Sequence, residues 1–375
     1  MSERHAADDE RWLRRTLTLA RRGAATAAPN PRVGAVLVRG GRAIAEGFHR
    51  RAGEPHAEIV ALSQLPPGGA RGATLYVNLE PCAHHGRTPP CAGAVIDAGI
   101  RRVVCCHRDP HPAVGGRGLR RLRRAGIEVR SGLLMEEAVR LNLPFLVSHL
   151  CARPAVTLKW AASLDGRIAT RTGESQWISS PGGRRWALEL REEHDAILVG
   201  SGTVASDDPR LDRRLARAAG PILRVVLDRR LRLSPAARLF QVPGPVLLYT
   251  ERAAEAARRR LVAAGAEVAV LPRVEPAAVL ADLGARGVHS VLVEGGAAVL
   301  GAFAAAGAFD RVAVCCAPLL IGGEGAPGPL AGPGAERLAD AARVEGVRVR
   351  RRGHDLILEG VRQGCLRDLS QRLAG

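Results

Sequence analysis

A set of four residues with the chemistry of a zinc site restricts the fold of this chain most strongly. His56-Ala57-Glu58 is followed by Pro81-Cys82 and then by Cys91. One imidazole and two thiolates bind Zn²⁺ and leave a fourth position open, which is typical of a catalytic site. His56 begins an expected helix near 56–64, and Cys82 follows an expected strand near 73–79. The fold must therefore bring the ends of these elements to one cleft.

Glu58 and the spacing of the cysteines indicate which zinc chemistry to expect. A carboxylate two residues after the histidine can move protons without binding the metal, and this order resembles that of the zinc nucleobase deaminases. Those enzymes usually have two residues between the cysteines, whereas eight residues separate Cys82 from Cys91 here. The longer loop contains His84 and Arg87, which favour a small phosphorylated substrate over an extruded base. Alternatively, His84 and the neighbouring His85 are solvated loop residues.

Helices and strands alternate in both halves, which predicts an α/β protein. In the first half we expect a helix at 8–22, strands at 33–38 and 42–48 joined at Gly40-Gly41, strands at 73–79 and 101–107, and helices near 56–64, 91–99, 117–125 and 135–149. We expect a boundary near 150–154, which separates a domain of residues 1–150 from one of residues 154–375. In the second, we expect strands near 155–160, 195–200, 222–228, 245–250, 267–271, 289–293 and 311–317, helices at 181–193 and 251–264, and a loop at 322–336.

Three motifs of the first half point to one family. They are Asn30-Pro31-Arg32-Val33-Gly34, Ala52-Gly53-Glu54-Pro55-His56-Ala57-Glu58 and the segment from Leu79-Glu80-Pro81-Cys82 to Thr88-Pro89-Pro90-Cys91. With these motifs the chain resembles the bifunctional deaminase–reductases of riboflavin biosynthesis, over most of its length. The resemblance implies a cytidine-deaminase-like three-layer domain followed by a dihydrofolate-reductase-like α/β domain.

The resemblance also implies the chemistry of the first domain. The expected reaction is hydrolytic removal of the 2-amino group from 2,5-diamino-6-ribosylamino-4(3H)-pyrimidinone 5′-phosphate. His56, Cys82 and Cys91 would hold one zinc ion per chain, and Glu58 would act as general acid and base. Asn30, His84 and Arg87 would bind the substrate, although Asn30 could instead be a turn residue before Pro31. His49 is a weaker candidate, equally well explained as a strand-end histidine.

For the second domain, the resemblance implies reduction of the ribosyl side chain to ribityl with NADPH. The first strand of this half lacks the Gly-x-Gly-x-x-Gly fingerprint of Rossmann folds, which the expected fold does not need. The implied cofactor contacts are Ala161, Trp177, Thr203, Asp207, Gly296, Ala297, Ala298, Val299, Leu300, Gly301 and Ala302. The implied substrate contacts are Lys159, Ser175, Arg191, Leu211, Arg214 and Glu294. Arg191 and Arg214 suit a phosphate because guanidinium groups bind it through two hydrogen bonds. Alternatively, either arginine is a solvated surface charge. For Lys159 the alternative is a structural ion pair.

Two positions depart from the pattern of that family. Asp212 stands where a threonine is usual, so we expect it to repel a substrate phosphate unless Arg213 or Arg214 compensates. Arg229 stands where a small hydroxyl residue is often found, which leaves that contact with the cofactor in doubt.

The remaining expectations concern charge, partners and location. The net charge is +18, but Lys159 is the only lysine, the arginines are scattered, and aromatic residues make up 3%. This composition gives few platforms for stacking bases, so we expect no nucleic-acid partner. No apolar run reaches the roughly 18 residues of a membrane span, and we expect neither a secretory signal nor a membrane partner but a cytoplasmic homo-oligomer, a dimer or a tetramer. Two alternatives stay open, a deaminase with a degenerate reductase domain and an RNA-binding or RNA-editing deaminase.

Overall fold

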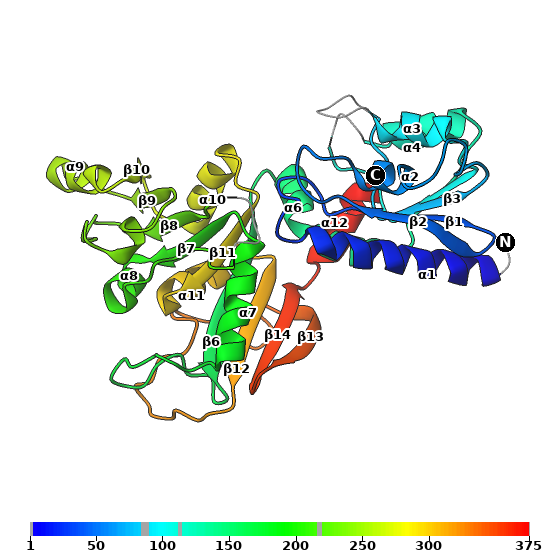
Figure 1. Ribbon diagram of the computed structural model, residues 1–375. Helices are drawn as coiled ribbons and strands as arrows, with labels where there is room; N and C mark the ends of the chain where they lie inside the picture. Colours follow the sequence, from blue (N-terminus) through cyan, green and yellow to red (C-terminus); the bar gives the residue numbers. More distant parts are fainter. Residues whose placement is uncertain (1–2, 84–89, 112–114, 216–219, 375) are drawn as a thin grey trace. The chain divides into compact units, whose positions relative to one another are not determined.

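The computed structural model describes residues 3–83, 90–111, 115–215 and 220–374, which form two compact units (Figure 1). The first comprises Met1–Cys151 and Leu366–Gly375, and the second comprises Ala152–Cys365. This division falls close to the boundary expected near 150–154. However, α12 (Cys365–Ala374) was expected in the second domain and lies with the first. It is held there because Arg372 donates to the carbonyl of Leu150 at 2.8 Å and Arg108 donates to that of Leu373 at 3.1 Å.

The first unit is built on a five-stranded sheet with the order β2-β1-β3-β4-β5. β1 pairs antiparallel with β2 and β3, whereas β3, β4 and β5 run parallel. Gly40 and Gly41 form the turn between β1 and β2 with φ of 57° and 72°, a conformation that favours glycine. The strands are β1 (Gly34–Arg39), β2 (Arg42–Phe48), β3 (Thr74–Val77), β4 (Arg102–Cys105) and β5 (Glu128–Ser131).

Helices cover both faces of this sheet and make three layers. One face packs against α1 (Glu3–Ala20) and α5 (Met135–Leu141), through residues such as Leu13 and Leu17. The other face packs against α2 (Ala57–Leu62), α3 (Cys91–Asp97) and α4 (Arg117–Arg124). A short 3₁₀ turn, η1 (Arg21–Gly23), ends α1, and α6 (Leu143–Cys151) follows α5. α2 begins directly after His56, and α3 begins at Cys91, so the predicted zinc ligands lie at the starts of these two helices.

The second unit is built on a nine-stranded sheet with the order β10-β9-β8-β7-β11-β6-β12-β14-β13. The strands from β10 to β12 run parallel, and β14 is antiparallel to both β12 and β13. They are β6 (Ala155–Ser163), β7 (Ala196–Gly200), β8 (Leu223–Leu227), β9 (Val246–Thr250), β10 (Ala266–Val270), β11 (Ser290–Gly295), β12 (Arg311–Ala317), β13 (Val344–Arg352) and β14 (Asp355–Arg362).

Alternating side chains of these strands face two separate cores. Ala196 and Leu198 of β7 face α10 (Pro276–Ala285) and α11 (Ala297–Ala305), whereas Ile197 and Val199 face α8 (Ser201–Asp207) and α9 (Glu255–Ala263). α7 (Pro181–Glu192) packs its Trp186 on β11, β12 and β14, and η2 (Arg238–Phe240) lies between β8 and β9. In the part of the chain that is described, no helix is both long and apolar enough to cross a bilayer.

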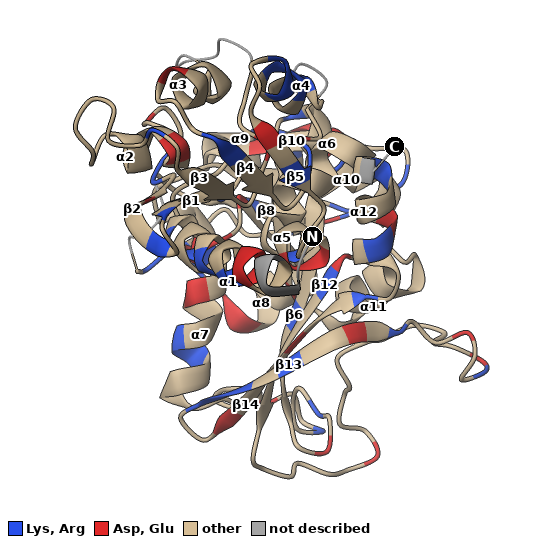
Figure 2. Ribbon diagram, turned by 90° about the vertical axis from the view of Figure 1, so that its right-hand side faces the viewer, with Lys and Arg blue, Asp and Glu red and all other residues tan. Residues whose placement is uncertain are grey.

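Basic residues are distributed over many elements of both units (Figure 2). Five of the eight residues of α4 are arginines, and this helix stands out in the figure. Elsewhere acidic residues are interspersed with the arginines, and many form ion pairs, such as Arg15 with Glu46 and Arg286 with Glu267. The excess of arginine is therefore a property of the whole surface more than of one nucleic-acid-binding face.

Candidate active sites

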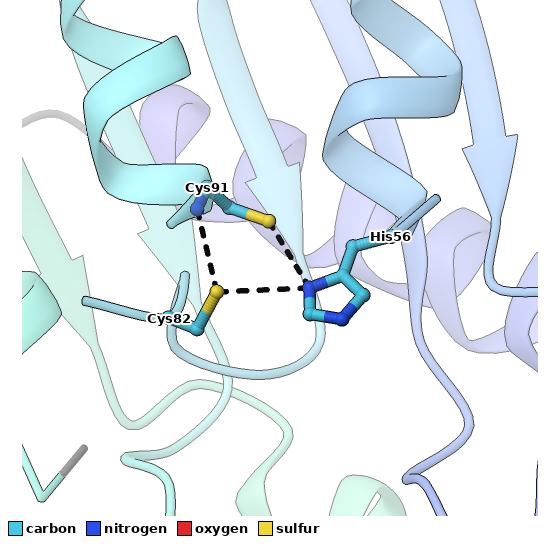
Figure 3. A group of neighbouring side chains, drawn as sticks. All are labelled: His56, Cys82 and Cys91. Carbon is cyan, nitrogen blue, oxygen red and sulfur yellow. Dashed lines mark hydrogen bonds between the residues drawn. The ribbon is translucent and has the colours of Figure 1, made fainter. Parts of the chain in front are cut away.

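The three zinc-type residues converge although they come from three separate segments (Figure 3). His56 precedes the first residue of α2, Cys82 lies in the segment after β3, and Cys91 is the first residue of α3. Their ligand atoms all lie within 4.8 Å of one another. His56 Nδ1 is 3.2 Å from Cys91 Sγ and 3.6 Å from Cys82 Sγ. The arrangement gives one nitrogen and two sulfurs around a single point, as a zinc site requires.

The surroundings of Cys82 favour its thiolate. The pKa of Cys82 is well below that of an ordinary thiol, although burial opposes this shift. Three neighbouring groups lower it: the thiol of Cys91, the imidazole of His56 and the backbone N–H of Cys91. The nitrogen of that N–H is 3.3 Å from Cys82 Sγ. Zinc binds cysteine as the thiolate, so the donor set suits this metal.

Glu58 lies in the first turn of α2 and is 3% exposed. Burial raises its pKa to about 7, with His56 opposing the shift and Cys82 adding to it. A carboxyl group in this environment can either hold or release a proton near neutral pH. The sequence predicted a proton carrier at this position. In the structure Glu58 is close enough to Cys82 and Cys91 for both to act on its pKa.

A cavity of about 410 Å³ opens onto this group, and Asn30 and His49 line it. Asn30 Nδ2 is 3.0 Å from His49 Nε2, and His49 Nδ1 is 3.2 Å from the carbonyl oxygen of Pro55. The carbonyl must accept from Nδ1–H, so His49 Nε2 accepts from Asn30. Among the described residues, Asn30 Oδ1 has no hydrogen-bond partner and is available to a ligand.

Glu80 is a site residue to which the sequence analysis assigned no role. It is 3% exposed, and its carboxylate accepts backbone N–H bonds from Asp109, Gly116 and Leu119 at 2.9 to 3.1 Å. These bonds fix the segment before α4 against the strand end that leads to Cys82. The signal in the sequence was the position of Glu80 directly before Pro81-Cys82, but its partners are about 30 to 40 residues away.

The cavity has further walls that the sequence did not indicate, formed by Asp109, His111, Phe145 and His149. The rings of Phe145 and His149 have centroids 4.4 Å apart, and those of His111 and His149 are 5.6 Å apart. Flat side chains of this kind suit a planar ring in the cavity. The predicted substrate contacts His84 and Arg87 lie outside the described residues.

In the second unit, Arg191 and Glu294 form a buried ion pair. Arg191 Nε and Nη2 are 2.9 and 2.6 Å from the two carboxylate oxygens of Glu294. Burial raises the pKa of Glu294, but the charges of Arg191 and Lys159 lower it to about 2. Val293 of β11 is in register with Leu158 of β6, which sets Glu294 beside Lys159 on neighbouring strands. Arg191 was predicted to bind phosphate, but its guanidinium is largely occupied by Glu294.

Asp212 lies in the same region and is paired with two arginines. Its carboxylate is 2.8 Å from Arg210 Nη2 and 3.0 Å from Arg214 Nε, and its backbone carbonyl accepts from Arg191 at 3.3 Å. The compensation expected from Arg214 is therefore present, with Arg210 as a second partner. Arg213 does not contribute, because it donates instead to the backbone carbonyls of 191, 194 and 220.

Part of the predicted cofactor set lines a second cavity, of about 320 Å³. Ala298, Val299 and Ala302 of α11 line it, together with Gly200 at the end of β7 and Ser201 and Gly202 at the start of α8. Thr203 lies close by, since a methyl group added to Gly296 would be 3.2 Å from Thr203 Oγ1. A methyl added to Gly200 would be 2.9 Å from Val299, so larger residues would narrow this cavity.

Several other residues that were predicted to bind cofactor or substrate do not line this cavity. Leu300 is 1% exposed in the core, and a methyl on Gly301 would be 1.7 Å from the carbonyl oxygen of Ala331. Leu211 is 2% exposed and packs in the core of the second unit. Trp177 is 68% exposed beneath the guanidinium of Arg184 at 4.8 Å. The remaining predicted residues line neither cavity: Ala161, Ser175, Asp207 and Ala297.

Comparison with known families matches each unit separately. Residues 6–107 match the cytidine and deoxycytidylate deaminase zinc-binding region, and residues 154–358 match the RibD C-terminal domain. Fold and site thus define a zinc-dependent deaminase joined to a reductase. The chain belongs to the RibD family of bifunctional deaminase–reductases of riboflavin biosynthesis.

Relatives over the whole chain support this assignment. The chain is 42% identical to the riboflavin biosynthesis protein RibD of Escherichia coli (strain K12), over 93% of this chain and 98% of the relative. It is 41% identical to that of Bacillus amyloliquefaciens, over 94% and 96%. The structure of Acinetobacter baumannii RibD superposes with a TM-score of 0.85 at 36% identity, over 95% of this chain and 99% of that one.

The fold class predicted from the sequence is confirmed, with a deaminase-type domain before a reductase-type domain. Membership of this family supports the prediction of zinc and, in general, of a nicotinamide cofactor. Members of the family act on small phosphorylated pyrimidines.

Proposed function

We propose that the first unit removes the 2-amino group of 2,5-diamino-6-ribosylamino-4(3H)-pyrimidinone 5′-phosphate and that the second reduces the ribosyl side chain of the product with NADPH. The substrates follow from a relative from Thermotoga maritima, a diaminohydroxyphosphoribosylaminopyrimidine deaminase/5-amino-6-(5-phosphoribosylamino)uracil reductase. It aligns over 96% of this chain at 36% identity, with a TM-score of 0.82. The convergence of His56, Cys82 and Cys91 beside the buried Glu58 is the observation that carries the proposal.

The residues of the first site fit one zinc ion per chain. His56 Nδ1 and the two cysteine sulfurs hold it, because they are the donors that zinc prefers and they face one another. When bound, zinc acts as a Lewis acid that activates water at neutral pH. Cys82 contributes a thiolate that its neighbours already stabilise.

Glu58 moves the protons of the deamination. Its carboxylate accepts the proton that the attacking water loses, and returns protons to the ring nitrogen and to the departing ammonia. Asn30 holds the pyrimidine edge: its Nδ2 is committed to His49, and its Oδ1 is left to accept a ring or amino N–H. The imidazole and phenyl rings of His149 and Phe145 supply the flat wall of the cavity.

The residues of the second unit fit a nicotinamide dinucleotide. The small residues at Gly200, Gly296 and Ala298 leave a cradle between β7 and α11. When bound, NADPH supplies hydride to C1 of the sugar in its open imine form, which becomes the ribityl amine. Lys159, fixed beside Glu294, delivers the proton that the nitrogen gains or polarises the C=N bond. Arg214 and Arg210 bind the substrate's phosphate, and their ion pairs with Asp212 partly neutralise their charge.

Metal content and ammonia release test the first half of this proposal together. The purified chain should contain about one zinc per chain, and Cys82→Ser should lose both zinc and ammonia release. Cys151→Ser is the matched control, because Cys151 is a half-buried cysteine of the same unit outside the site. A Cys82→Ser protein that retains its zinc would contradict the assignment of ligands.

The two alternatives and the oligomeric state have their own tests. A degenerate second unit would leave NADPH unconsumed in the presence of the deaminated phosphate. An RNA-binding role would give an affinity for RNA that falls steeply with salt. We also propose that the protein is a cytoplasmic homo-oligomer, and light scattering of the purified chain measures whether it is a dimer or a tetramer.

A further inference from the structure

A group of arginines beside the second cavity has no role in the function proposed so far. Arg229, Arg230 and Arg232 follow β8 and line the same cavity of about 320 Å³ as Ala298 and Val299. All three are exposed. Three guanidinium groups at the rim of one cavity form a local concentration of positive charge that favours an anionic ligand.

The turn that carries these arginines is rigidly held. Asp228 is 2% exposed, its carboxylate accepts the N–H of Leu233 at 3.0 Å, and its carbonyl accepts that of Leu231 at 3.1 Å. Leu231 and Leu233 are 2% and 5% exposed and anchor the turn in the core. Because buried leucines alternate with arginines, Arg230 and Arg232 are directed outward from an ordered backbone.

The charges of these arginines are not equally balanced. Arg229 pairs with Glu251, with 3.4 Å between Nε and Oε1. Arg230 and Arg232 form no hydrogen bond or ion pair with any residue that the structure describes. By contrast, the guanidinium groups of Arg191 and Arg214 are paired with Glu294 and Asp212. The two unpaired guanidinium groups are therefore available to a ligand in the second cavity.

The apolar residues that line the same cavity indicate what kind of anion it accepts. Ala298, Val299, Ala302 and Phe303 give it an apolar surface, which suits a flat apolar group that carries a phosphate. We propose that Arg230 and Arg232 bind the 2′-phosphate at the adenosine end of NADPH and so select NADPH over NADH. This inference rests on the proposed reductase function and adds to it the residues that choose the cofactor. Guanidinium groups suit a phosphate monoester because they bind it through two hydrogen bonds each.

Binding of nucleotides to the full-length protein, without turnover, tests the proposal. The dissociation constants of NADP⁺ and NAD⁺ are measured by calorimetry for the wild type and for Arg230→Gln/Arg232→Gln. We expect the double variant to bind NADP⁺ about 10- to 100-fold more weakly, because it loses charge-assisted hydrogen bonds, and NAD⁺ with little change. Adenosine 2′,5′-bisphosphate should lose affinity in parallel with NADP⁺, whereas adenosine 5′-monophosphate should not.

The control removes two other arginines of the same unit. Arg258→Gln/Arg260→Gln lowers the net charge equally on the exposed side of α9 and should leave every affinity unchanged. If the Arg230→Gln/Arg232→Gln variant keeps the wild-type affinity for NADP⁺, or loses NADP⁺ and NAD⁺ equally, the assignment of the 2′-phosphate is overturned while the reductase function stands. If the wild type binds neither nucleotide, the proposed reductase function itself fails.

Discussion

Removing the carboxylate of Glu294 should destabilise the second unit, because it leaves the partner of a buried ion pair without its counter-charge. Burial raises the pKa of Glu294, but Arg191 and Lys159 lower it to about 2, against an ordinary value of 4.5. At neutral pH this difference corresponds to about 3 kcal/mol of folding free energy. In Glu294→Gln the charge of Arg191 stays buried without its partner, for which a cost of about 3–5 kcal/mol is expected. We therefore predict a loss of about 3–4 kcal/mol.

The pH dependence and a double variant make this prediction specific. Because the pKa of Glu294 is lowered in the folded protein, its stabilisation is present above pH 4.5 and is lost as the pH falls towards 2. Glu294→Gln should lack this contribution. Arg191→Met/Glu294→Gln leaves neither charge buried, so it should be more stable than Glu294→Gln. Arg185→Gln, which removes an exposed i,i+4 partner of Glu189 on the same helix, should cost less than about 1 kcal/mol.

Tryptophan fluorescence during urea unfolding of the whole chain is a suitable assay. Three of the four tryptophans, Trp160, Trp177 and Trp186, belong to the second unit, so the signal reports mainly on that unit. The reasoning would be refuted if Glu294→Gln cost less than about 1 kcal/mol, or if the double variant were less stable than Glu294→Gln.

Three further predictions concern catalysis and acid stability. Glu58→Gln should keep its zinc but release ammonia several orders of magnitude more slowly, since no group then returns protons to the leaving amine; a near-normal rate would contradict the role. Burial lowers the pKa of His194 to about 4 from 6.5, so the second unit should lose up to about 3 kcal/mol as the pH falls through this window. An equally steep loss in His194→Gln, followed by urea unfolding, would refute the assignment. Asp212→Thr should free Arg210 and Arg214 and lower the KM for the phosphorylated substrate, with kcat little changed; steady-state kinetics in which only kcat responds would count against this.

The elements predicted correctly from the sequence are those with a clear apolar pattern. The strands with runs of valine, leucine and isoleucine, such as β1, β7 and β12, lie within about two residues of their expected bounds. β14 was missed although it is an interior strand, between β12 and β13, with most of its side chains buried. β5 and β13 were missed because they are edge strands, whose exposed side chains include several arginines and glutamates. Pairing with a neighbouring strand defines these strands, and a hydrophobic pattern does not.

The helix expected at 135–149 is two helices, α5 and α6, for a reason that depends on distant residues. Asn142 lies between them, and its side chain binds the backbone N–H and carbonyl of Arg32 at 2.7 and 3.0 Å. Pro144, at the second position of α6, cannot donate a hydrogen bond to the preceding turn. The proline was visible in the sequence, but the partner of Asn142 was not.

The candidate sites show the same limit. The order of His56, Glu58, Cys82 and Cys91 was sufficient to predict that they meet, because this combination has few other uses. The pairing of Asp212 with Arg210 and the bonds of Glu80 depend on how loops fold back, which spacing along the chain does not specify. In a chain this rich in arginine, only the structure distinguishes the paired guanidinium groups from the unpaired ones.

Mass spectrometry of the products formed from the diaminopyrimidine phosphate, with and without NADPH, tests the bifunctional account most directly. The account predicts that the protein alone replaces one amino group by oxygen and releases ammonia. With NADPH present, the product should contain two further hydrogen atoms on the sugar-derived chain, and NADPH should be consumed in equal amount. A substrate returned unchanged, or a deaminated product that gains no hydrogen with NADPH, would contradict the account.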